Sequence, residues 1–125
     1  MGVSKKNKRK FTYSDQLYYW LVAPTFDENG SQLAITIGSE NKKFLIEYYV
    51  FQQHVENRHI IVKGEFFPKL ENTASWQRIK CPMLVDIADN QIVSSKHIKQ
   101  VLDWCFDLNK EIHVVDVNGE LISAT

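Results

Sequence analysis

The chain is poor in the residues that build special chemistry or cross a membrane. It has only two cysteines, Cys81 and Cys105, three prolines, and five glycines that stand apart from one another. Two cysteines cannot form the dense disulfide framework of a small secreted domain. Isolated glycines exclude a glycine-rich phosphate loop. No apolar run approaches the ~20 residues that a membrane-spanning helix requires.

The N-terminal segment also has no apolar core after its lysines, so we expect no secretory signal. The 125 residues are 44% hydrophobic and 24% charged, which is ordinary for one soluble domain. We therefore expect a cytoplasmic protein with reduced thiols. Residues 10–125 are assigned to a single α+β domain, and residues 1–9 to a disordered basic tail.

The formal net charge of zero hides an asymmetry. Five cations fall within six residues, and the rest of the chain carries about five negative charges. The five cations are Lys5, Lys6, Lys8, Arg9 and Lys10. A nucleic-acid-binding domain normally spreads its positive charge over a folded face rather than along an arm. As an arm, these residues predict weak phosphate contact, with a salt slope of about −4 on duplex DNA.

Alternating and aromatic-rich patterns predict about six strands. The expected strands are residues 10–13, 16–23, 33–37, 43–51, 59–67 and 76–81, with Pro24 and Pro82 ending the second and the sixth. The pairing of Leu33–Ile37 with Phe44–Tyr48 is the strongest expected hairpin. Gly64, inside the fifth segment, indicates a bulge or a close approach of the backbone.

The hydrophobic period then changes from two to about 3.6 residues, which predicts one amphipathic helix. Its apolar stripe comprises Ile98, Val101, Leu102, Cys105 and Leu108. Ser94 is the expected N-cap and Asn109 the expected C-terminal cap. After the helix, residues 112–117 and 120–123 flank Asn118-Gly119, which predicts a C-terminal β-hairpin.

These elements predict a curved, mostly antiparallel sheet with one helix packed on its concave face. Six strands make a sheet about 29 Å wide, whereas one helix is ~10 Å across. The helix therefore covers about a third of one face, although several strands are apolar on both faces. Strong curvature of the sheet around the helix is one solution, and a symmetric dimer through the outer aromatic face is the other.

The aromatic residues left over from the core are the predicted binding surface. They are Tyr18, Trp20, Tyr49 and Phe51, and their area would exceed the apolar patch that a monomer tolerates. Aromatic residues on an open sheet also stack bases in some RNA-binding folds. These four are not interleaved with arginines, so a protein partner or a second copy is the first expectation.

Two groups of residues could carry metal or acid–base chemistry, but each has a simpler interpretation. His54, Glu56 and His59 lie within six residues, yet zinc usually takes three or four ligands in fixed geometry, so we interpret them as loop residues. His97, with Asp103 or Asp107, could form an acid–base pair, but the spacings of six and ten residues do not place either beside it. No metal or cofactor site is predicted.

The two cysteines and the carboxylates also give no catalytic constellation. Cys105 lies on the apolar helix stripe, where cysteine behaves as a small hydrophobe, and Cys81 has no histidine nearby in the sequence. The carboxylates form no recognisable pair; they are Glu40, Glu47, Glu65 and Glu71. No catalytic residue is predicted, and a small hydrolase with an unrecognised site stays an alternative.

The order of segments resembles a group of small bacterial proteins that have no assigned activity. The segments that carry the resemblance are KKNKRKFTY, YYWLV, L-x-I-x-I, KKFLIEY, IIVKGEFFP, RIKCP and VSSKHIKQVLDWCFD, which together span about residues 5–108. The resemblance implies a bacterial cytosolic origin and transfers no functional residue.

The functional hypothesis is thus a non-enzymatic binding module that uses an aromatic sheet face for self-association or for a protein partner. A nucleic-acid accessory role through the basic tail is the alternative.

Overall fold

The computed structural model describes residues 8–27, 30–50, 57–70, 75–86, 92–116 and 119–122. Within these ranges the chain forms seven strands and one helix. The strands are β1 (Arg9–Tyr13), β2 (Gln16–Asp27), β3 (Gly30–Ser39), β4 (Leu45–Tyr49), β5 (His59–Lys63), β6 (Gln77–Lys80) and β7 (Val114–Val115), and the helix α1 (Ser95–Cys105) lies between β6 and β7.

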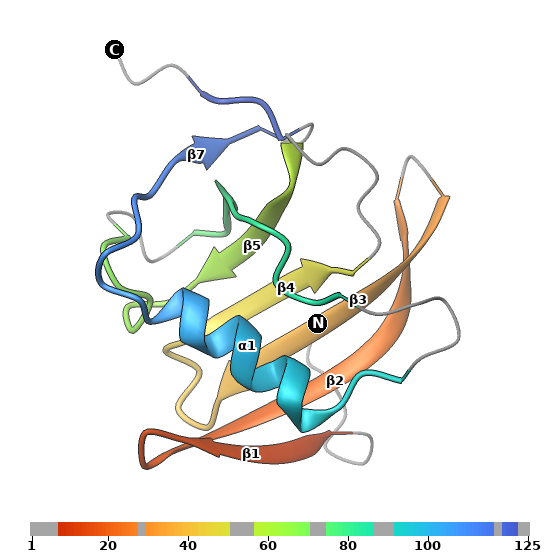
Figure 1. Ribbon diagram of the computed structural model, residues 1–125, viewed down its shortest axis with the longest axis vertical. Coiled ribbons are helices and arrows are strands. Elements are labelled where there is room, and N and C mark those ends of the chain that lie inside the picture. The colour runs from red at the N-terminus through yellow and green to blue at the C-terminus, as the bar shows by residue number, and fades with distance from the viewer. Residues whose placement is uncertain are drawn as a thin grey trace.

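The sheet is one antiparallel meander in which each strand pairs with the next, from β1 to β7. Figure 1 shows the sheet curving around α1, with β1 on one side of the helix axis and β7 on the other. The expected α+β class, antiparallel pairing and single helix are confirmed. The sheet has seven strands rather than about six, because the segment after α1 adds β7 to β6.

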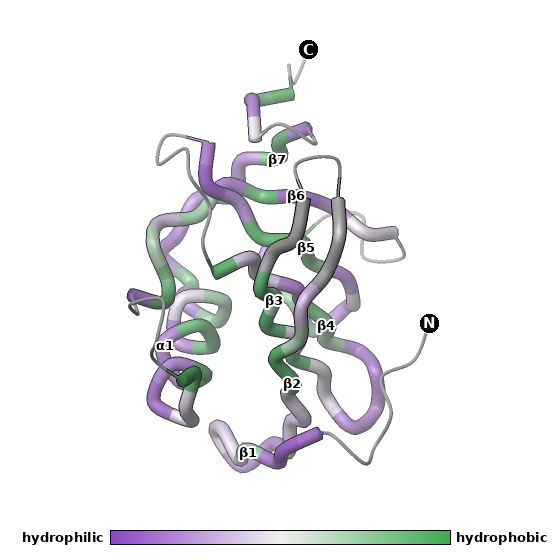
Figure 2. Tube along the Cα trace, turned by 90° about the vertical axis from the view of Figure 1, so that its right-hand side faces the viewer, coloured by the Kyte–Doolittle hydropathy of each residue, from purple (hydrophilic) through white to green (hydrophobic). Residues whose placement is uncertain are grey.

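The helix packs on one face of the sheet, which we call the inner face (Figure 2). Four residues of the predicted stripe are buried: Ile98, Val101, Leu102 and Cys105. Opposite them lie fully buried β-branched and aromatic side chains of β3, β4, β5 and β6. Alternate residues of the strands point inward, so the period-two pattern of the strands and the 3.6 pattern of the helix meet in one core.

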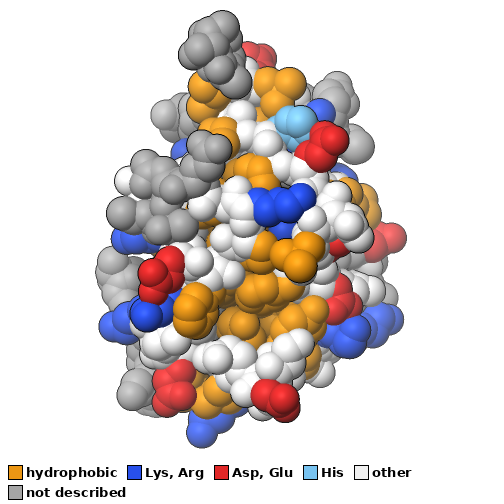
Figure 3. All heavy atoms as spheres, turned by 90° about the vertical axis from the view of Figure 1, so that its left-hand side faces the viewer, with side chains coloured by type: hydrophobic (Ala, Val, Ile, Leu, Met, Phe, Trp, Pro, Cys, Tyr) orange, Lys and Arg blue, Asp and Glu red, His pale blue; other side chains and the backbone are white. Residues whose placement is uncertain are grey.

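An aromatic cluster fills one end of this core. The Phe44 ring stacks on Phe67 and Phe106, and its edge meets Tyr18 at 5.6 Å between ring centroids. Tyr13 closes the cluster from β1 by stacking on Phe106 at 5.8 Å. Hydrophobic side chains gather on this side of the molecule in Figure 3. The rings thus seal the end of the curved sheet where the meander alone would leave the core open.

Pro24 does not end the second strand, as the sequence suggested, because β2 continues to Asp27. The position of Pro24 in the sheet explains why β2 continues past it. The pairing of β1 with β2 stops at Arg9 and Trp20, so β2 beyond Trp20 pairs only with β3. Proline lacks the backbone N–H and is tolerated where a strand has a free edge.

The helix ends earlier than the sequence suggested. Its last residue is Cys105 and its C-cap is Phe106, so Asn109 is not the cap. Leu108, which was expected on the apolar stripe, lies past the helix and is 67% exposed. The helix C-terminus is instead met by Lys110, whose Nζ donates hydrogen bonds to the carbonyls of Cys105 and Asp107. A cation at this end complements the negative end of the helix dipole.

The C-terminal hairpin is much shorter than the sequence suggested. β7 has two residues, and Val115 bridges Leu121 across a turn in which the Gly119 N–H donates to the Asp116 carbonyl at 2.9 Å. Asn118 lies outside the described residues. Gly64 does mark a close approach, because it has φ +112° and a Cβ at this position would collide with the Lys43 carbonyl.

Phe44→Ala should be strongly destabilising because Phe44 is fully buried at the centre of the aromatic cluster. We expect a loss of about 3–5 kcal/mol in the free energy of unfolding, measured by guanidinium denaturation. Leu108→Ala is the control, with an expected change of no more than about 0.5 kcal/mol. Equal effects of the two substitutions would contradict the described core.

The phenols of the core should make stability depend on alkaline pH. Burial raises the pKa of Tyr13 to about 12, and its hydrogen bond to Asp103 at 2.7 Å adds to the effect. A phenol whose pKa is raised on folding stabilises the fold below about pH 10, and this contribution is lost as the pH rises toward 12.

Denaturation at pH values between 8 and about 12 tests this expectation, with Tyr13→Phe as the matched variant. The variant should lose less stability over this range than the natural chain, because it has one fewer phenol to ionise. An identical decline in both chains would show that Tyr13 titrates as in the unfolded state.

Candidate binding surface on the outer face of the sheet

The register of the central strands determines which side chains lie on the face opposite the helix, the outer face. Tyr19 pairs with Gly38, and Gly38 pairs with Leu45. In the next outward-facing row, Leu21 pairs with Thr36, which in turn pairs with Glu47. The middle strand therefore presents small residues between larger ones on β2 and β4.

This difference in side-chain size produces a groove of ≈ 660 Å³ on the outer face. Its floor includes Ala34, Thr36 and Gly38 of β3, and its lining also includes Tyr19 and Leu45. The volume is within the range of pockets that hold small molecules. The groove is therefore large enough to accept side chains or rings of a partner.

Two aromatic residues with a lysine over each ring contribute to the groove. Trp76, just before β6, is 47% exposed, and the Lys63 ammonium lies 5.9 Å from its ring centroid. Lys8 lies over Tyr19 at the same distance. Such cation–π pairs are worth about 0.5–1 kcal/mol when exposed, so they can hold the rings in position but can also be rearranged by a ligand.

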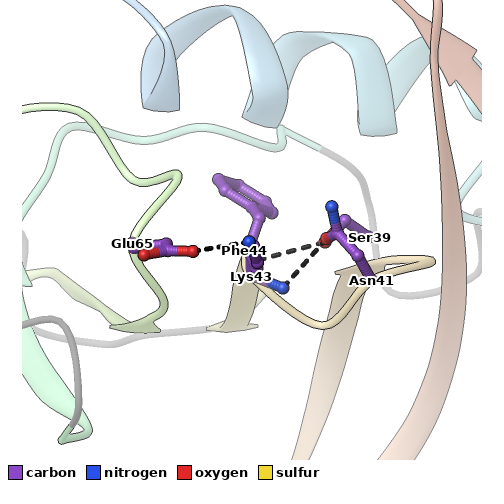
Figure 4. Close-up of polar contacts among 5 residues, drawn as sticks. All are labelled: Ser39, Asn41, Lys43, Phe44 and Glu65. Carbon is purple, nitrogen blue, oxygen red and sulfur yellow. Dashed lines mark hydrogen bonds and ion pairs between the residues drawn. The ribbon is translucent and has the colours of Figure 1, made fainter.

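The turn between β3 and β4 closes the groove at one end and is held by side-chain hydrogen bonds (Figure 4). The Phe44 N–H donates to Ser39 Oγ at 3.1 Å, and Ser39 Oγ donates to Asn41 Oδ1 at 2.7 Å. Lys43 forms an ion pair with Glu65 at 2.9 Å. The Ser39 hydroxyl thereby links the turn to the backbone of Phe44, just before β4. The same hydrogen bond therefore holds both the end of the groove and a residue of the core.

The four aromatic residues predicted as a binding surface do not lie on one face. Tyr18 and Trp20 are 3% and 5% exposed, and both belong to the core, so they cannot form an exposed contact surface. Their positions follow from the register, because Trp20 pairs with Ile37 and Ile37 with Ile46, which are all inner residues. Tyr49 lies on the outer face and is partly buried. Phe51 lies outside the described residues.

The basic segment is described only from Lys8 onward, and Lys5 and Lys6 lie outside the described residues. Arg9 and Lys10 belong to β1, and the Arg9 guanidinium lies 5.4 Å from the ring centroid of Trp20. Lys10 pairs with Tyr19 and therefore points to the outer face. Part of the basic segment is thus built into the sheet beside the groove.

The histidines that were weighed as ligands or bases have local roles where they are described. His54 and Glu56 lie outside the described residues, and His59 Nδ1 is 3.0 Å from the Asn57 carbonyl. No group of three or more histidine, cysteine, aspartate or glutamate side chains that could hold a metal ion occurs within the described ranges. His97 Nδ1 accepts a hydrogen bond from the Ser94 N–H at 3.0 Å and so helps to cap α1, whose expected N-cap is confirmed.

The carboxylates weighed as acids or bases are dispersed. Asp103 accepts hydrogen bonds from Lys99 and Tyr13, and these contacts lower its pKa. Glu65 is paired with Lys43, and Glu40 and Glu47 line different parts of the groove. Glu71 lies outside the described residues.

Both thiols are buried. Burial raises the pKa of Cys81 to about 12, and it raises the pKa of Cys105 further still. A thiol acts as a nucleophile only as the thiolate, so these environments oppose reactivity. The interpretation of both cysteines as core residues agrees with their burial.

The sequence reasoning missed Tyr19, Thr36 and Trp76 as groove residues. Gly38 and Ala34 were the available signal, because small residues at alternate positions of a central strand leave space on one sheet face. That signal becomes useful only when the strands on both sides are known.

Comparisons with protein-family models, curated proteins and solved structures returned no match to this chain. Among the residues that the structure describes, no helix has the length and apolar character to cross a membrane.

Alkylation by iodoacetamide tests the thiol environments. At pH 8 the native chain should react on the order of 1000-fold more slowly than the chain in denaturant, because a pKa near 12 leaves almost no thiolate. Mass spectrometry of the modified chain measures the rate for each cysteine. Rapid alkylation of either thiol under native conditions would contradict its buried position.

Proposed function

We propose that the protein is a non-enzymatic binding module that recognises its partner with the outer face of the sheet. The observation that carries the proposal is the groove over β2, β3 and β4, with the exposed Trp76 at its margin. Aromatic anchors beside a pocket are typical of binding surfaces, where they supply large contact area at low entropic cost.

The division of the sheet into two faces supports this proposal. The helix and the aromatic cluster occupy the inner face, so the residues there serve stability. On the outer face, Leu21, Leu45 and Tyr49 are only partly buried. Apolar groups at an exposed sheet surface are a cost unless they serve a contact, which favours a binding role for this face.

The lining of the groove favours recognition over catalysis. Its described residues include Glu40 and Glu47 as the carboxylates and contain neither cysteine nor histidine. Ser39 also lines the groove, but its hydroxyl donates to the amide oxygen of Asn41 and not to a general base. The groove instead offers shape, aromatic surface and charge, which together select a partner.

A screen of neutral aromatic fragments by NMR tests the binding face. Fragments should shift the amide signals of Tyr19, Thr36 and Glu47 more than those of α1. Thr36→Phe places a large side chain on the groove floor and should weaken fragment binding by about tenfold or more, since a lost contact of ~1.4 kcal/mol is a factor of ten.

Thr12→Phe is the matched control because Thr12 is exposed on β1 and does not line the groove. It should leave fragment binding unchanged, and both variants should unfold at the same denaturant concentration within error. Fragments that shift only residues around Tyr13 and Phe106, or that bind Thr36→Phe as well as the natural chain, would overturn the proposal. Sedimentation of the same samples shows whether a second copy occupies the face.

A further inference from the structure

The outer face has a marked surplus of positive charge. Among the residues whose side chains the structure describes, the pairing register and the contact of Lys8 with Tyr19 place five cations on this face, against one strand carboxylate, Glu47. The cations are Lys8, Lys10, Lys63, Arg78 and Lys80. Positive charge therefore extends across the sheet and is not confined to the N-terminal arm.

None of these cations forms an ion pair with a described carboxylate, although Lys8 and Lys63 lie over the rings of Tyr19 and Trp76. In the part of the chain that the structure describes, the ion pairs join Lys43 to Glu65, Lys99 to Asp103 and His113 to Glu111, and none involves a cation of the outer face. At the turn that closes the groove, Glu40 and Lys42 cancel one another. An anionic partner would therefore meet uncompensated charge over the sheet.

Four of the five cations border the groove, and Lys8 contributes to its lining. Lys8 and Lys10 are at the β1 side, and the other three are on β5 and β6. Five strand spacings separate β1 from β6, which corresponds to about 24 Å along a flat sheet. Between them lie the small floor residues and the ring of Tyr19, and the Trp76 ring lies at the β6 margin. Two charged borders thus flank a central strip suited to flat rings.

We infer that the partner of this face is single-stranded nucleic acid, an inference that rests on the proposed binding role of the groove. Bases would stack on Tyr19 and Trp76, and phosphates would lie along the cations of β1, β5 and β6. Proteins that bind single strands combine a positive groove with aromatic stacking platforms in this way. In a duplex the faces of the bases are stacked on one another, so the aromatic rings would have no partner.

Glu47 supports this orientation of the ligand. Its carboxylate lies within the groove, between Thr36 on one neighbouring strand and Ile61 on the other. A carboxylate repels phosphate but accepts hydrogen bonds from the exocyclic amino groups of bases. The groove therefore favours bases at its centre and phosphates at its borders. An acidic peptide would place carboxylates near Glu47 and would gain nothing from the two rings.

Fluorescence anisotropy with a labelled, mixed-sequence single strand of about ten nucleotides tests the inference on the full chain. Affinity should fall with salt with a slope of about −3.5, as expected for five phosphate contacts on a single strand. A duplex of the same sequence and an aspartate-rich peptide should bind more weakly at equal salt. Equal binding of all three would reduce the site to general attraction of anions and overturn the inference.

Charge variants locate the contact. Lys63→Gln with Lys80→Gln should reduce the salt slope by about 1.4. Lys96→Gln with Lys99→Gln removes the same charge from the exposed face of α1 and should leave the slope unchanged. Lys5→Gln with Lys6→Gln tests the N-terminal arm. A slope that changes only with the arm variant, or equally with the α1 variant, would contradict the sheet-face site.

Aromatic variants test stacking. Trp76→Ala should weaken oligonucleotide binding by about 5- to 150-fold, the range for loss of one stacked base. Phe66→Ala is the control, because Phe66 is also exposed and has the Lys43 ammonium 5.6 Å from its ring centroid, yet it does not line the groove. Fragment binding in the groove without oligonucleotide binding would refute the ligand class and leave the proposed binding role in place.

Discussion

The architecture depends on one geometric constraint: a single helix can cover only one face of a sheet. The meander meets this constraint by curving, so that α1 and the inner faces of the strands share one core. The aromatic rings around Phe44 then close the end that the curvature leaves open. The other row of strand side chains, which includes the groove and its charges, stays uncovered by the helix.

The sequence was sufficient for the parts of the fold that depend on local periodicity. The spacing of Ile98, Val101, Leu102 and Cys105 identified the buried face of α1, and the alternation in Leu33–Ile37 identified the central hairpin. Both patterns report which side chains share a face of one element. They do not report which face of a strand meets the helix, and this is where the prediction of Tyr18 and Trp20 as surface residues was wrong.

That error has a defined physical source. Tyr18 and Trp20 alternate with Tyr19 and Leu21, and both rows are apolar, so composition alone could not separate them. The separation requires knowledge of which face of β2 the distant helix α1 covers, and no local pattern in β2 reports that contact. The position of Leu108 was missed for a related reason, because Lys110 folds back onto the helix end and competes with continuation of the helix.

The two sheet margins have a further consequence, which concerns association between chains. An edge strand with unpaired backbone groups can template the addition of a foreign strand. At one margin β1 carries the exposed Arg9 and Lys10, and at the other β7 is two residues long and is bridged by Leu121. At the β1 margin, the positive charges of Arg9 and Lys10 repel a second copy of the same strand. At the β7 margin, the strand is too short to offer a foreign strand many backbone hydrogen bonds. The sheet therefore ends in two margins that are poor seeds for fibrous aggregation.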